Sequence, residues 1–592
     1  MKKIFLLAFA AATVLTGCDD LFEPAIENNK ALEDGRNDPV FAEGILANAY
    51  TRNPYNSQSF NDVATDDAVT NQTSDSYLLM ATGSWTSNNN PMNQWDGCKA
   101  AIQYLNMFLS EVDQTTFAED ETVNQLFRNR LKGEAYGLRA MNMFYLLQAH
   151  AGWTQDGQLL GVPIVNYMED VSSNFNLARN TLDECIQAIS DDVDAALEIL
   201  PLDYGDVASN AEMPQYYQNM GVEFYDYNRV FGTTFLTRMS GRIAKAFLAK
   251  ALLLAASPAF SEGSAYTWED AANENGELLQ DIGGLSGFSA TGNTWYKNGT
   301  EIDELGAGEN PLEMLWRNGK NTNNSDLELA QFPPSMLGNG HINPTQNLVD
   351  AFPMANGYPI TDPNSGYNDQ DPYTNRDPRL ALYIVTNGST VGVQSPTVIN
   401  TAADNTANND GLNRENGRST RTGYYLRKHL REDVTLNASG THNGQAHYSP
   451  RIRYTEIFLN YAEAANEAWG PQGTGSFGFS AYDVIKAIRQ RGGVGLDNGD
   501  PYLESIKGDQ AAMRELIRNE RRLELCFEGF RFWDMRRWEL PLDEPAMGIR
   551  ISGGTYTPFE VEERHYEDYM TYGPIPYSEM LKFDALQQNA GW

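Results

Sequence analysis

Apolar residues recur at helical spacing in separated blocks along this chain, which predicts a mainly helical skeleton. The blocks are residues 39–50, 95–109, 123–150, 181–200, 240–256, 451–469, 481–491 and 513–538. Within the third block, Gly133 and Gly137 alternate with larger residues such as Leu138 and Phe144. Small residues let a second helix approach closely, which favours helix pairs of the tetratricopeptide kind. However, no fixed period of about 34 residues repeats along the chain.

Long polar segments rich in Asn, Gly, Asp, Ser and Thr separate the helical blocks. They are residues 53–93, 203–235, 283–310, 318–347 and 387–416. Loops longer than about 15 residues are usually functional or disordered. These segments carry aromatic residues, which favours ordered loops that pack or bind something. Residues 315–317 and 382–385 are candidate strands. We therefore expect a mainly α fold, with tetratricopeptide-like helix pairs, long irregular loops and a minor β component.

The N-terminal segment has the features of a lipoprotein signal. Lys2 and Lys3 precede an apolar run, residues 4–15, and the sequence Leu-Thr-Gly-Cys then ends at Cys18. A helix needs about 20 residues to cross a bilayer, so export with cleavage fits this run better than a retained span. The pattern resembles a lipobox, so we expect residues 1–17 to be removed and Cys18 to carry the lipid. An ordinary secretory signal with a chance cysteine is the alternative.

Composition and charge limit the kinds of partner and cofactor that the chain is expected to bind. The formal net charge of −36 excludes the clustered basic surface that nucleic-acid binding requires. With Cys18 assigned to lipid, Cys98, Cys185 and Cys526 allow at most one disulfide, and burial is the favoured role of each. No zinc-binding spacing, phosphate-binding glycine motif or nucleophile elbow is present, and the acidic run 362–371 lacks the EF-hand pattern. We therefore expect no cofactor and no metal.

The final helical block, residues 518–538, reads RNERRLELCFEGFRFWDMRRW. Its arginines and acids stand three residues apart, as in Arg521 with Glu524, Glu528 with Arg531, and Asp534 with Arg537. Such local neutrality in an acidic chain indicates paired, partly buried ions. Gly529 should mark a helix break or a close backbone contact.

This block resembles the C-terminal hallmark of the SusD/RagB family. Other segments that are similar to the family are residues 133–140, 161–164, 240–256, 375–380, 453–464, 488–493 and 573–576, together with the final residues 589–592. The resemblance implies a single SusD-like body over residues 18–592, with an N-terminal part at about 24–235 and a C-terminal part at about 236–592. It also implies a non-enzymatic outer-membrane lipoprotein that captures oligosaccharide for a SusC-like, TonB-dependent transporter. Acidic residues directly after Cys18 resemble the signal that sends some lipoproteins to the cell surface.

Sugar recognition needs flat apolar faces for the rings and polar groups for the hydroxyls. The loop 61–94 offers both, and its position after the first helix resembles the family's ligand loop. The ligand-binding candidates there are Asp67, Tyr77, Trp85 and Asn88. Trp85 is the preferred ring platform, with loop anchoring as the alternative, and Trp295 with Tyr296 is a weaker second platform. If Trp85 is a platform, Trp85→Ala should weaken binding and leave the thermal midpoint little changed.

Three other functions stay open. Some SusD/RagB relatives take peptides, so a peptide-binding nutrient protein is the first alternative. A surface glycoside hydrolase would use two carboxylates, but arginines beside Glu520, Glu524 and Asp534 would lower the pKa values that a general acid needs raised. A scaffold that holds other proteins on its helix pairs is the third. Ligand depletion without cleavage would separate these from oligosaccharide capture.

Overall fold

The computed structural model describes residues 38–55, 59–306 and 308–592. The expected signal peptide, residues 1–17, and Cys18 lie outside these residues. The described chain is mainly helical, which confirms the predicted fold class. The long helices are α3 (Pro39–Thr51), α5 (Trp95–Glu111), α6 (Glu121–His150), α7 (Leu182–Ile199), α10 (Gly241–Ala256), α12 (Trp268–Gln280), α17 (Tyr454–Trp469), α18 (Ala481–Gly492) and α20 (Gln510–Glu524).

Eleven shorter helices are present among the described residues, and about half of them lie in segments that the sequence pattern marks as loops. They are α4 (Ser76–Leu79), α8 (Gln215–Asn219), α9 (Phe224–Phe231), α11 (Pro258–Ser261), α13 (Gly299–Glu304), α14 (Asp326–Gln331), α15 (Gln346–Ala351), α16 (Pro378–Tyr383), α19 (Pro501–Ile506), α21 (Arg531–Arg537) and α22 (Tyr577–Lys582). Helices this short show too few turns for a clear apolar period, which is why the pattern misses all of them except α21, which lies in the predicted block 513–538.

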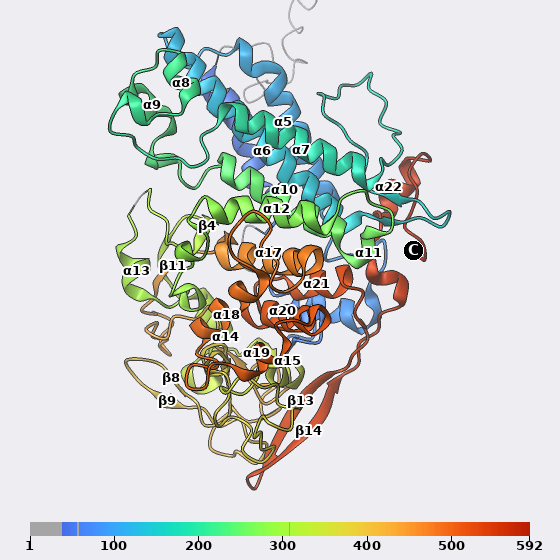
Figure 1. Cartoon of the computed structure of the whole chain (residues 1–592). Helices are drawn as coiled ribbons and strands as arrows, with labels where there is room; N and C mark the ends of the chain where they lie inside the picture. Colours follow the sequence, from blue (N-terminus) through green and yellow to red (C-terminus); the bar gives the residue numbers. More distant parts are fainter. Residues whose placement is uncertain (1–37, 56–58, 307) are drawn as a thin grey trace, which may run out of the picture.

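Consecutive long helices pack against one another as pairs. Helix α6 packs on α5 and α7, α10 packs on α12, and α12 packs on α17 (Figure 1). Local signals fix the helix ends: Asp38 caps α3, whose first residue is Pro39, and Thr181 with Glu184 forms a capping box at α7. This arrangement gives the tetratricopeptide-like character that the small-residue pattern predicts.

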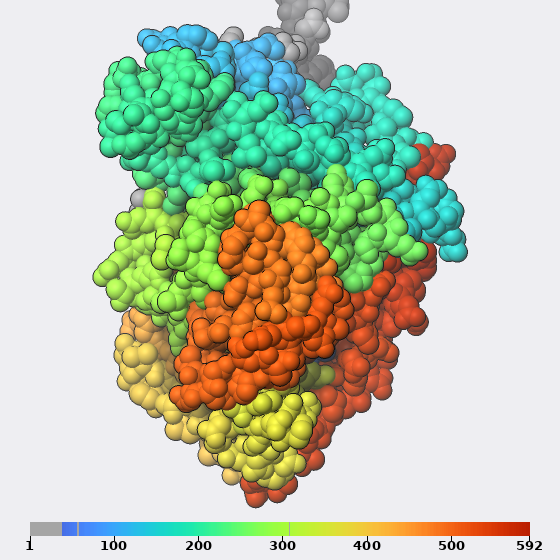
Figure 2. All heavy atoms as spheres, in the orientation of Figure 1, coloured from blue at the N-terminus to red at the C-terminus, as the bar shows by residue number. Residues whose placement is uncertain are grey.

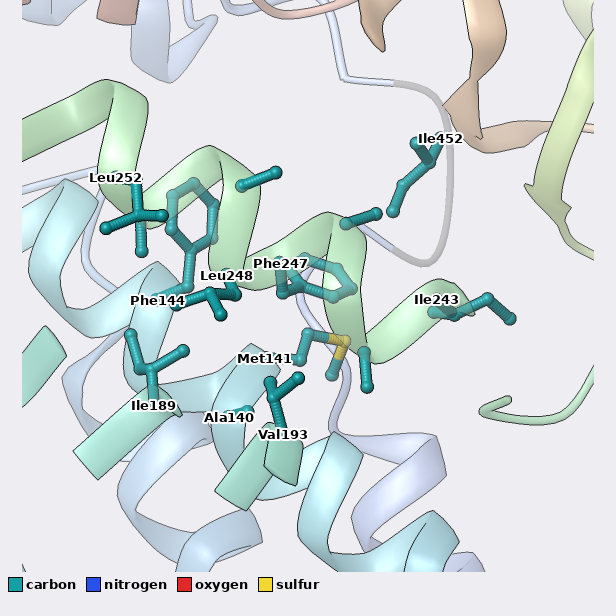
Figure 3. Close-up of a cluster of buried hydrophobic side chains, with 14 of the residues drawn as sticks. Ala140, Met141, Phe144, Ile189, Val193, Ile243, Phe247, Leu248, Leu252 and Ile452 are labelled. Atoms are coloured by element: carbon teal, nitrogen blue, oxygen red, sulfur yellow. The ribbon is translucent and has the colours of Figure 1, made fainter. Parts of the chain in front are cut away.

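The main core lies where α6, α7 and α10 meet. Figure 3 shows Phe144 of α6, Val193 of α7 and Phe247 of α10 turned toward one another. The helices approach so closely that a Cβ on Gly137 would lie 2.6 Å from Met239 Cγ, and one on Gly133 would lie 2.4 Å from Leu200 Cγ. Larger residues at these two positions would force the helices apart, which costs packing.

Every sheet in the described residues has two antiparallel strands. The pairs are β1 (Ala68–Thr70) with β6 (Ile342–Pro344), β2 (Gly152–Trp153) with β3 (Leu159–Leu160), β4 (Met314–Arg317) with β12 (Pro450–Arg453), β5 (Asn321–Asn324) with β11 (Gln445–His447), β7 (Ile384–Val385) with β10 (Tyr425–Leu426), β8 (Thr390–Val391) with β9 (Thr397–Val398), and β13 (Ala546–Ser552) with β14 (Thr555–Glu562). The β13–β14 hairpin runs along one edge of the molecule (Figure 1). It turns at Gly553 and Gly554, both at positive φ.

The predicted final helix is broken in two, as Gly529 indicates. Helix α20 ends at Glu524 and α21 begins at Arg531, with Phe527 at φ +61° and Gly529 at φ +82° between them. The carbonyl of Gly529 accepts a hydrogen bond from Asn61 Nδ2 at 3.3 Å. The break therefore holds the start of the predicted ligand loop against the C-terminal helices.

Buried ion pairs join the helical layers. Glu524 pairs with Arg379 at 3.0 Å and with Arg491 at 2.9 Å, and Glu528 pairs with Arg453 at 2.7 Å. Figure 2 shows the segment that carries α17–α20 between the N-terminal helices and the irregular loops. The prediction of paired, buried ions is confirmed. A carboxylate left unpaired there would cost about 3–5 kcal/mol.

The predicted partners within this network are only partly right. Asp534 and Arg537 pair at 2.8 Å, as their spacing indicates. Arg521 instead pairs with Asp534 at 2.7 Å, and Arg531 with Asp66 at 2.9 Å. For Glu528 and Arg531 the reason is the helix break, because helical spacing does not carry across residues 525–530. Arg521 and Glu524 both lie in α20, but each pairs with a residue outside that helix. The three described cysteines, Cys98, Cys185 and Cys526, are all free and buried, so the predicted burial is confirmed.

Candidate functional site

A hollow of about 450 Å³ lies beside the predicted ligand loop, and we call it the loop groove. Its lining residues are Asn71, Thr73, Leu78, Leu79, Thr82, Asn413, Glu415, Asn416, Gly417, Ser419, Arg421 and Glu562. Its volume falls within the range of about 300–1,000 Å³ that is typical of small-molecule sites. Three segments distant in sequence therefore share one cavity.

The first wall of the loop groove is fixed through β1 and Asn71. Strand β1 pairs with β6, and Asn71 follows β1 directly. Asn71 Nδ2 donates to the carbonyls of Gly340 at 2.8 Å and Asn339 at 3.1 Å. Only 4% of the residue is exposed, and its Oδ1 accepts no hydrogen bond within the described part of the chain. A buried acceptor of this kind is costly unless a donor meets it, which makes Asn71 Oδ1 a candidate partner for a ligand hydroxyl.

The second wall is the segment 413–421. Arg421 holds it to the first wall, since its Nη1 donates to the carbonyl of Thr70 at 2.8 Å and pairs with Glu562 at 2.9 Å. Ser419 Oγ donates to the carbonyl of Asn409 at 2.6 Å and accepts from Glu415 N. These bonds fix the backbone while Arg421 keeps 28% of its side chain exposed.

The lining of the loop groove is polar, with one apolar strip. Amides, hydroxyls, two carboxylates and one guanidinium face it, and Leu79 contributes an apolar surface that is 43% exposed. Amides and carboxylates both accept from hydroxyl groups, and amides and guanidinium also donate to them. Such a set suits a polyhydroxylated, uncharged ligand better than a phosphate or an apolar ligand.

Trp85 does not line the loop groove; it lies in an aromatic cluster beside a separate cavity of only about 50 Å³. The Trp85 cluster consists of Trp85, Phe532, Tyr566 and Trp592, whose rings lie 4.9–6.0 Å from that of Trp85. Arg536 lies over the indole at 5.1 Å. Trp85 Nε1 donates to Asn90 Oδ1 at 3.0 Å, and only 3% of the residue is exposed. In this conformation the indole has little surface to offer a sugar ring.

The other three candidates from the loop 61–94 lie in three different surroundings. Asp67 is fully buried and pairs with Arg522 within the ion network. Tyr77 is half-buried, with its hydroxyl 3.2 Å from that of Ser59. Asn88 is exposed on the turn that follows Trp85. None of these candidates lines the loop groove, so their contact with ligand stays a prediction.

Trp295 and Tyr296 lie together in a different cavity, of about 320 Å³. They are 4% and 3% exposed, and their ring centroids are 5.6 Å apart. This cavity shares no lining residue with the loop groove. The structure therefore keeps the two predicted platforms apart.

Sequence reasoning overlooked Arg421 and Glu562. The long Asn-rich segment ending at residue 416 marks a functional loop, but nothing in its pattern indicates that Arg421 meets Glu562 from a hairpin 141 residues later. Their pairing is tertiary. It could have been found only by first predicting the β13–β14 hairpin.

The acids of the C-terminal hallmark do not form a catalytic pair. Burial alone would raise the pKa of Glu524, but Arg491 and Arg379 outweigh it and lower the pKa to about 2. Burial would also raise the pKa of Asp534, but Arg521 and Arg537 outweigh it, so the pKa is lowered. A general acid needs the opposite shift, so structural pairing is the role that the geometry supports.

Two further observations concern membranes and metals. Within residues 38–55, 59–306 and 308–592, every helix is too short or too polar to cross a bilayer. In the same part of the chain, no three His, Cys, Asp or Glu side chains are grouped so that they could hold a metal ion.

Comparison with known proteins finds family models that match two parts of the chain. Residues 312–592 match the model of the SusD family, and residues 40–212 match a model described as starch-binding proteins that associate with the outer membrane. No protein of curated function matches the chain.

Solved structures share the fold. A SusD-like protein from Bacteroides fragilis NCTC 9343 is 21% identical, with a TM-score of 0.69 over 94% of this chain and 98% of its own. A SusD-like carbohydrate binding protein from the same strain is 20% identical, with a TM-score of 0.66 over 93% and 99%. A SusD homolog from Bacteroides thetaiotaomicron VPI-5482 is 19% identical, with a TM-score of 0.59 over 96% and 100%.

Proposed function

The chain belongs to the SusD/RagB family, and from this premise we propose that it captures oligosaccharide in the loop groove and delivers it to a SusC-like, TonB-dependent outer-membrane transporter. The lipid on Cys18 would hold it on the outer membrane, facing the exterior. We propose that it binds the glycan without cleaving it.

The observation that carries this proposal is the polar lining of the loop groove, above all Asn71 Oδ1. A sugar hydroxyl would donate to this buried oxygen, and further hydroxyls would meet Arg421 and Glu562. Leu79 would cover part of the C–H face of a ring. The net charge of −36 favours a neutral glycan over an acidic one, because a polyanion would be repelled.

The test is calorimetric titration of the purified protein with a panel of neutral oligosaccharides, acidic oligosaccharides and peptides, with product analysis of each mixture. We expect saturable binding of at least one neutral oligosaccharide and recovery of that glycan intact. Binding of peptides alone would replace the proposal with the peptide-binding alternative. Cleavage products would replace it with a hydrolase.

The variant Arg421→Ala tests whether the loop groove is the glycan-binding site. A hydrogen bond to a charged group is worth roughly 1.5–3 kcal/mol, so we expect glycan binding to weaken about tenfold to a hundredfold. Arg550→Ala is the matched control, because Arg550 is exposed on the β13–β14 hairpin and does not line the groove. Equal affinity in the two variants would remove the loop groove as the site. The thermal midpoint of each variant shows whether the fold is intact.

The anchor and the transporter need separate tests. Cys18→Ser removes the thiol that would carry the lipid, so we expect the protein to leave the membrane fraction, and retention there would contradict the lipid assignment. For delivery, cells that lack this chain should take up the bound glycan more slowly, and cells with Arg421→Ala should resemble them. Unchanged uptake would contradict delivery without affecting the binding result.

A further inference from the structure

A second cavity, which we call the Trp295 cavity, lies among the irregular loops of the C-terminal part. Its lining residues are Phe60, Trp295, Tyr296, Ile302, Asn321, Asn324, Asp326, Leu327, Ala330, Gln331, His429, His447, Tyr448 and Ser449. Its volume of about 320 Å³ lies at the small end of ligand-binding pockets. It is a compartment large enough for one compact ligand.

The aromatic walls of this cavity are held rigidly. The Trp295 and Tyr448 rings lie 5.7 Å apart at 34°, and the Tyr448 hydroxyl donates to the Trp295 carbonyl at 3.4 Å. The Tyr296 hydroxyl donates to the carbonyl of Leu382 at 2.9 Å. His429 bonds to the carbonyl of Phe527 at 2.9 Å. A ligand would meet walls that already have their shape, which lowers the entropy cost of binding.

One buried donor at this cavity has no partner. Trp295 is 4% exposed, and its Nε1–H meets no acceptor among the described residues. The indole N–H of Trp316 is a contrast, because it is equally hidden and donates to the carbonyl of Thr237 at 3.0 Å. Buried indole N–H groups usually find an acceptor, so a ligand oxygen is the expected partner of Trp295.

The chemistry of the walls selects among ligand classes. Neither Lys nor Arg lines the Trp295 cavity within the described chain, so an anion would gain little there. A quaternary ammonium group would suit the aromatic faces and the carboxylate of Asp326, but the group itself carries no acceptor for the Trp295 N–H, so choline could offer only its single hydroxyl. A neutral sugar offers both C–H faces for the rings and hydroxyl oxygens for the donor. Asn321 and Asn324 at the rim would meet its remaining hydroxyls.

We propose that the Trp295 cavity is a second carbohydrate subsite, which takes a single neutral sugar ring and accepts a hydrogen bond from Trp295 Nε1–H on one of its hydroxyl oxygens. This inference rests on the proposed oligosaccharide-binding function. The two sites share no lining residue and are built from different segments, so they bind independently. A glycan long enough to reach both would be held twice, and the second contact would form at an effective concentration of the millimolar order.

The experiment follows the indole N–H signals of ¹⁵N-labelled protein by NMR. The Trp295 signal is the one that disappears in Trp295→Phe, and the Trp316 signal is the internal control. Neutral monosaccharides and disaccharides are titrated in turn, with choline as the cationic alternative. We expect a saturable shift of the Trp295 signal with at least one sugar, no shift of Trp316, and the same response in Arg421→Ala.

The outcomes separate this inference from the proposed function. If calorimetry shows Arg421-dependent glycan binding while no sugar moves the Trp295 signal, the second subsite is wrong and the loop groove stands. A shift of the Trp295 signal without Arg421-dependent binding would support the second subsite and contradict the loop groove as a binding site. A response that vanishes in Arg421→Ala would show one coupled site and overturn the inference. If no sugar acts in either measurement, both proposals fail. A response to choline alone would assign the cavity to cations.

Discussion

Trp85 and Trp295 are almost equally hidden from solvent, at 3% and 4% exposed, yet their surroundings differ. Trp85 lies among three aromatic rings and Arg536, and its indole N–H is satisfied by Asn90. Trp295 also has aromatic neighbours, but it lines a cavity of about 320 Å³, against about 50 Å³ for the cavity beside Trp85. Its N–H meets no acceptor in the described chain. The exposed fraction alone would class both as packing residues.

The difference teaches that hydrogen-bond satisfaction separates the two roles where burial does not. A packing tryptophan needs its donor met by the protein, because an unmet donor costs about 1–3 kcal/mol. A recognition tryptophan can leave its donor to the ligand. On this criterion Trp85 is a packing residue, and Trp295 fits the second subsite that we propose.

The largest expected effect comes from removing the centre of the Trp85 cluster. Trp85→Ala should lower the free energy of unfolding by about 3–5 kcal/mol, because it opens a void among rings that cannot close it. Urea unfolding measures this loss. Asn88→Ala, on the exposed turn nearby, should stay within about 0.5 kcal/mol of the parent. A small loss of stability with weakened glycan binding would instead support the predicted ring platform.

A milder pair of changes tests the comparison directly. Trp85→Phe and Trp295→Phe each keep an aromatic ring and remove the indole N–H. Only the first breaks a hydrogen bond within the protein, so it should cost about 1 kcal/mol more of the free energy of unfolding. Equal losses in urea unfolding would show that the N–H of Trp295 is satisfied after all.

The smallest expected effect is a pH dependence confined to the Trp295 cavity. Burial lowers the pKa of His447, but its hydrogen bond to Glu328 at 3.0 Å and the charge of Glu328 outweigh burial and Arg431, so the pKa is raised above 6.5. Protonated His447 therefore stabilises the fold below pH 6.5. This contribution is lost as pH rises through the raised pKa.

The measurement is the urea midpoint between about pH 5 and 8, in the parent and in His447→Gln. The variant should lose this part of the pH dependence. The Trp85 cluster should not titrate in this range, because Arg536, whose pKa burial lowers to about 10, stays charged. Identical profiles for parent and variant would show that His447 does not couple to folding.

The fold could be predicted where apolar residues keep a helical period over several turns. Helices α3, α5, α6, α7 and α10 begin and end within two residues of their predicted bounds, and Gly529 correctly marks a break. Helix α12 and the β13–β14 hairpin were missed, the first because its buried stripe contains Asn275 and Gly276 where larger apolar residues would give a clear period. A sequence pattern predicts only local structure, so an element that is short or has a weak apolar period is not predicted.

The site was predicted less well, because it is made of contacts between distant segments. The loop 61–94 does supply one wall of the loop groove, through Asn71 and Thr82. The sequence predicts Asp67 as a ligand-binding residue, but its carboxylate pairs with Arg522, which lies 455 residues later. No spacing rule connects such residues.

That long separation has a consequence for how the protein is made. Asp66, Asp67 and the carbonyl of Thr65 are all held by arginines from the C-terminal part, namely Arg522, Arg531 and Arg564. Contacts between segments so far apart form late and slowly, because a long loop must close first. A chain that passes through a membrane pore N-terminus first would thus keep this segment open until most of its length has emerged. The arginines can therefore fix residues 65–67 only after almost the whole chain is available.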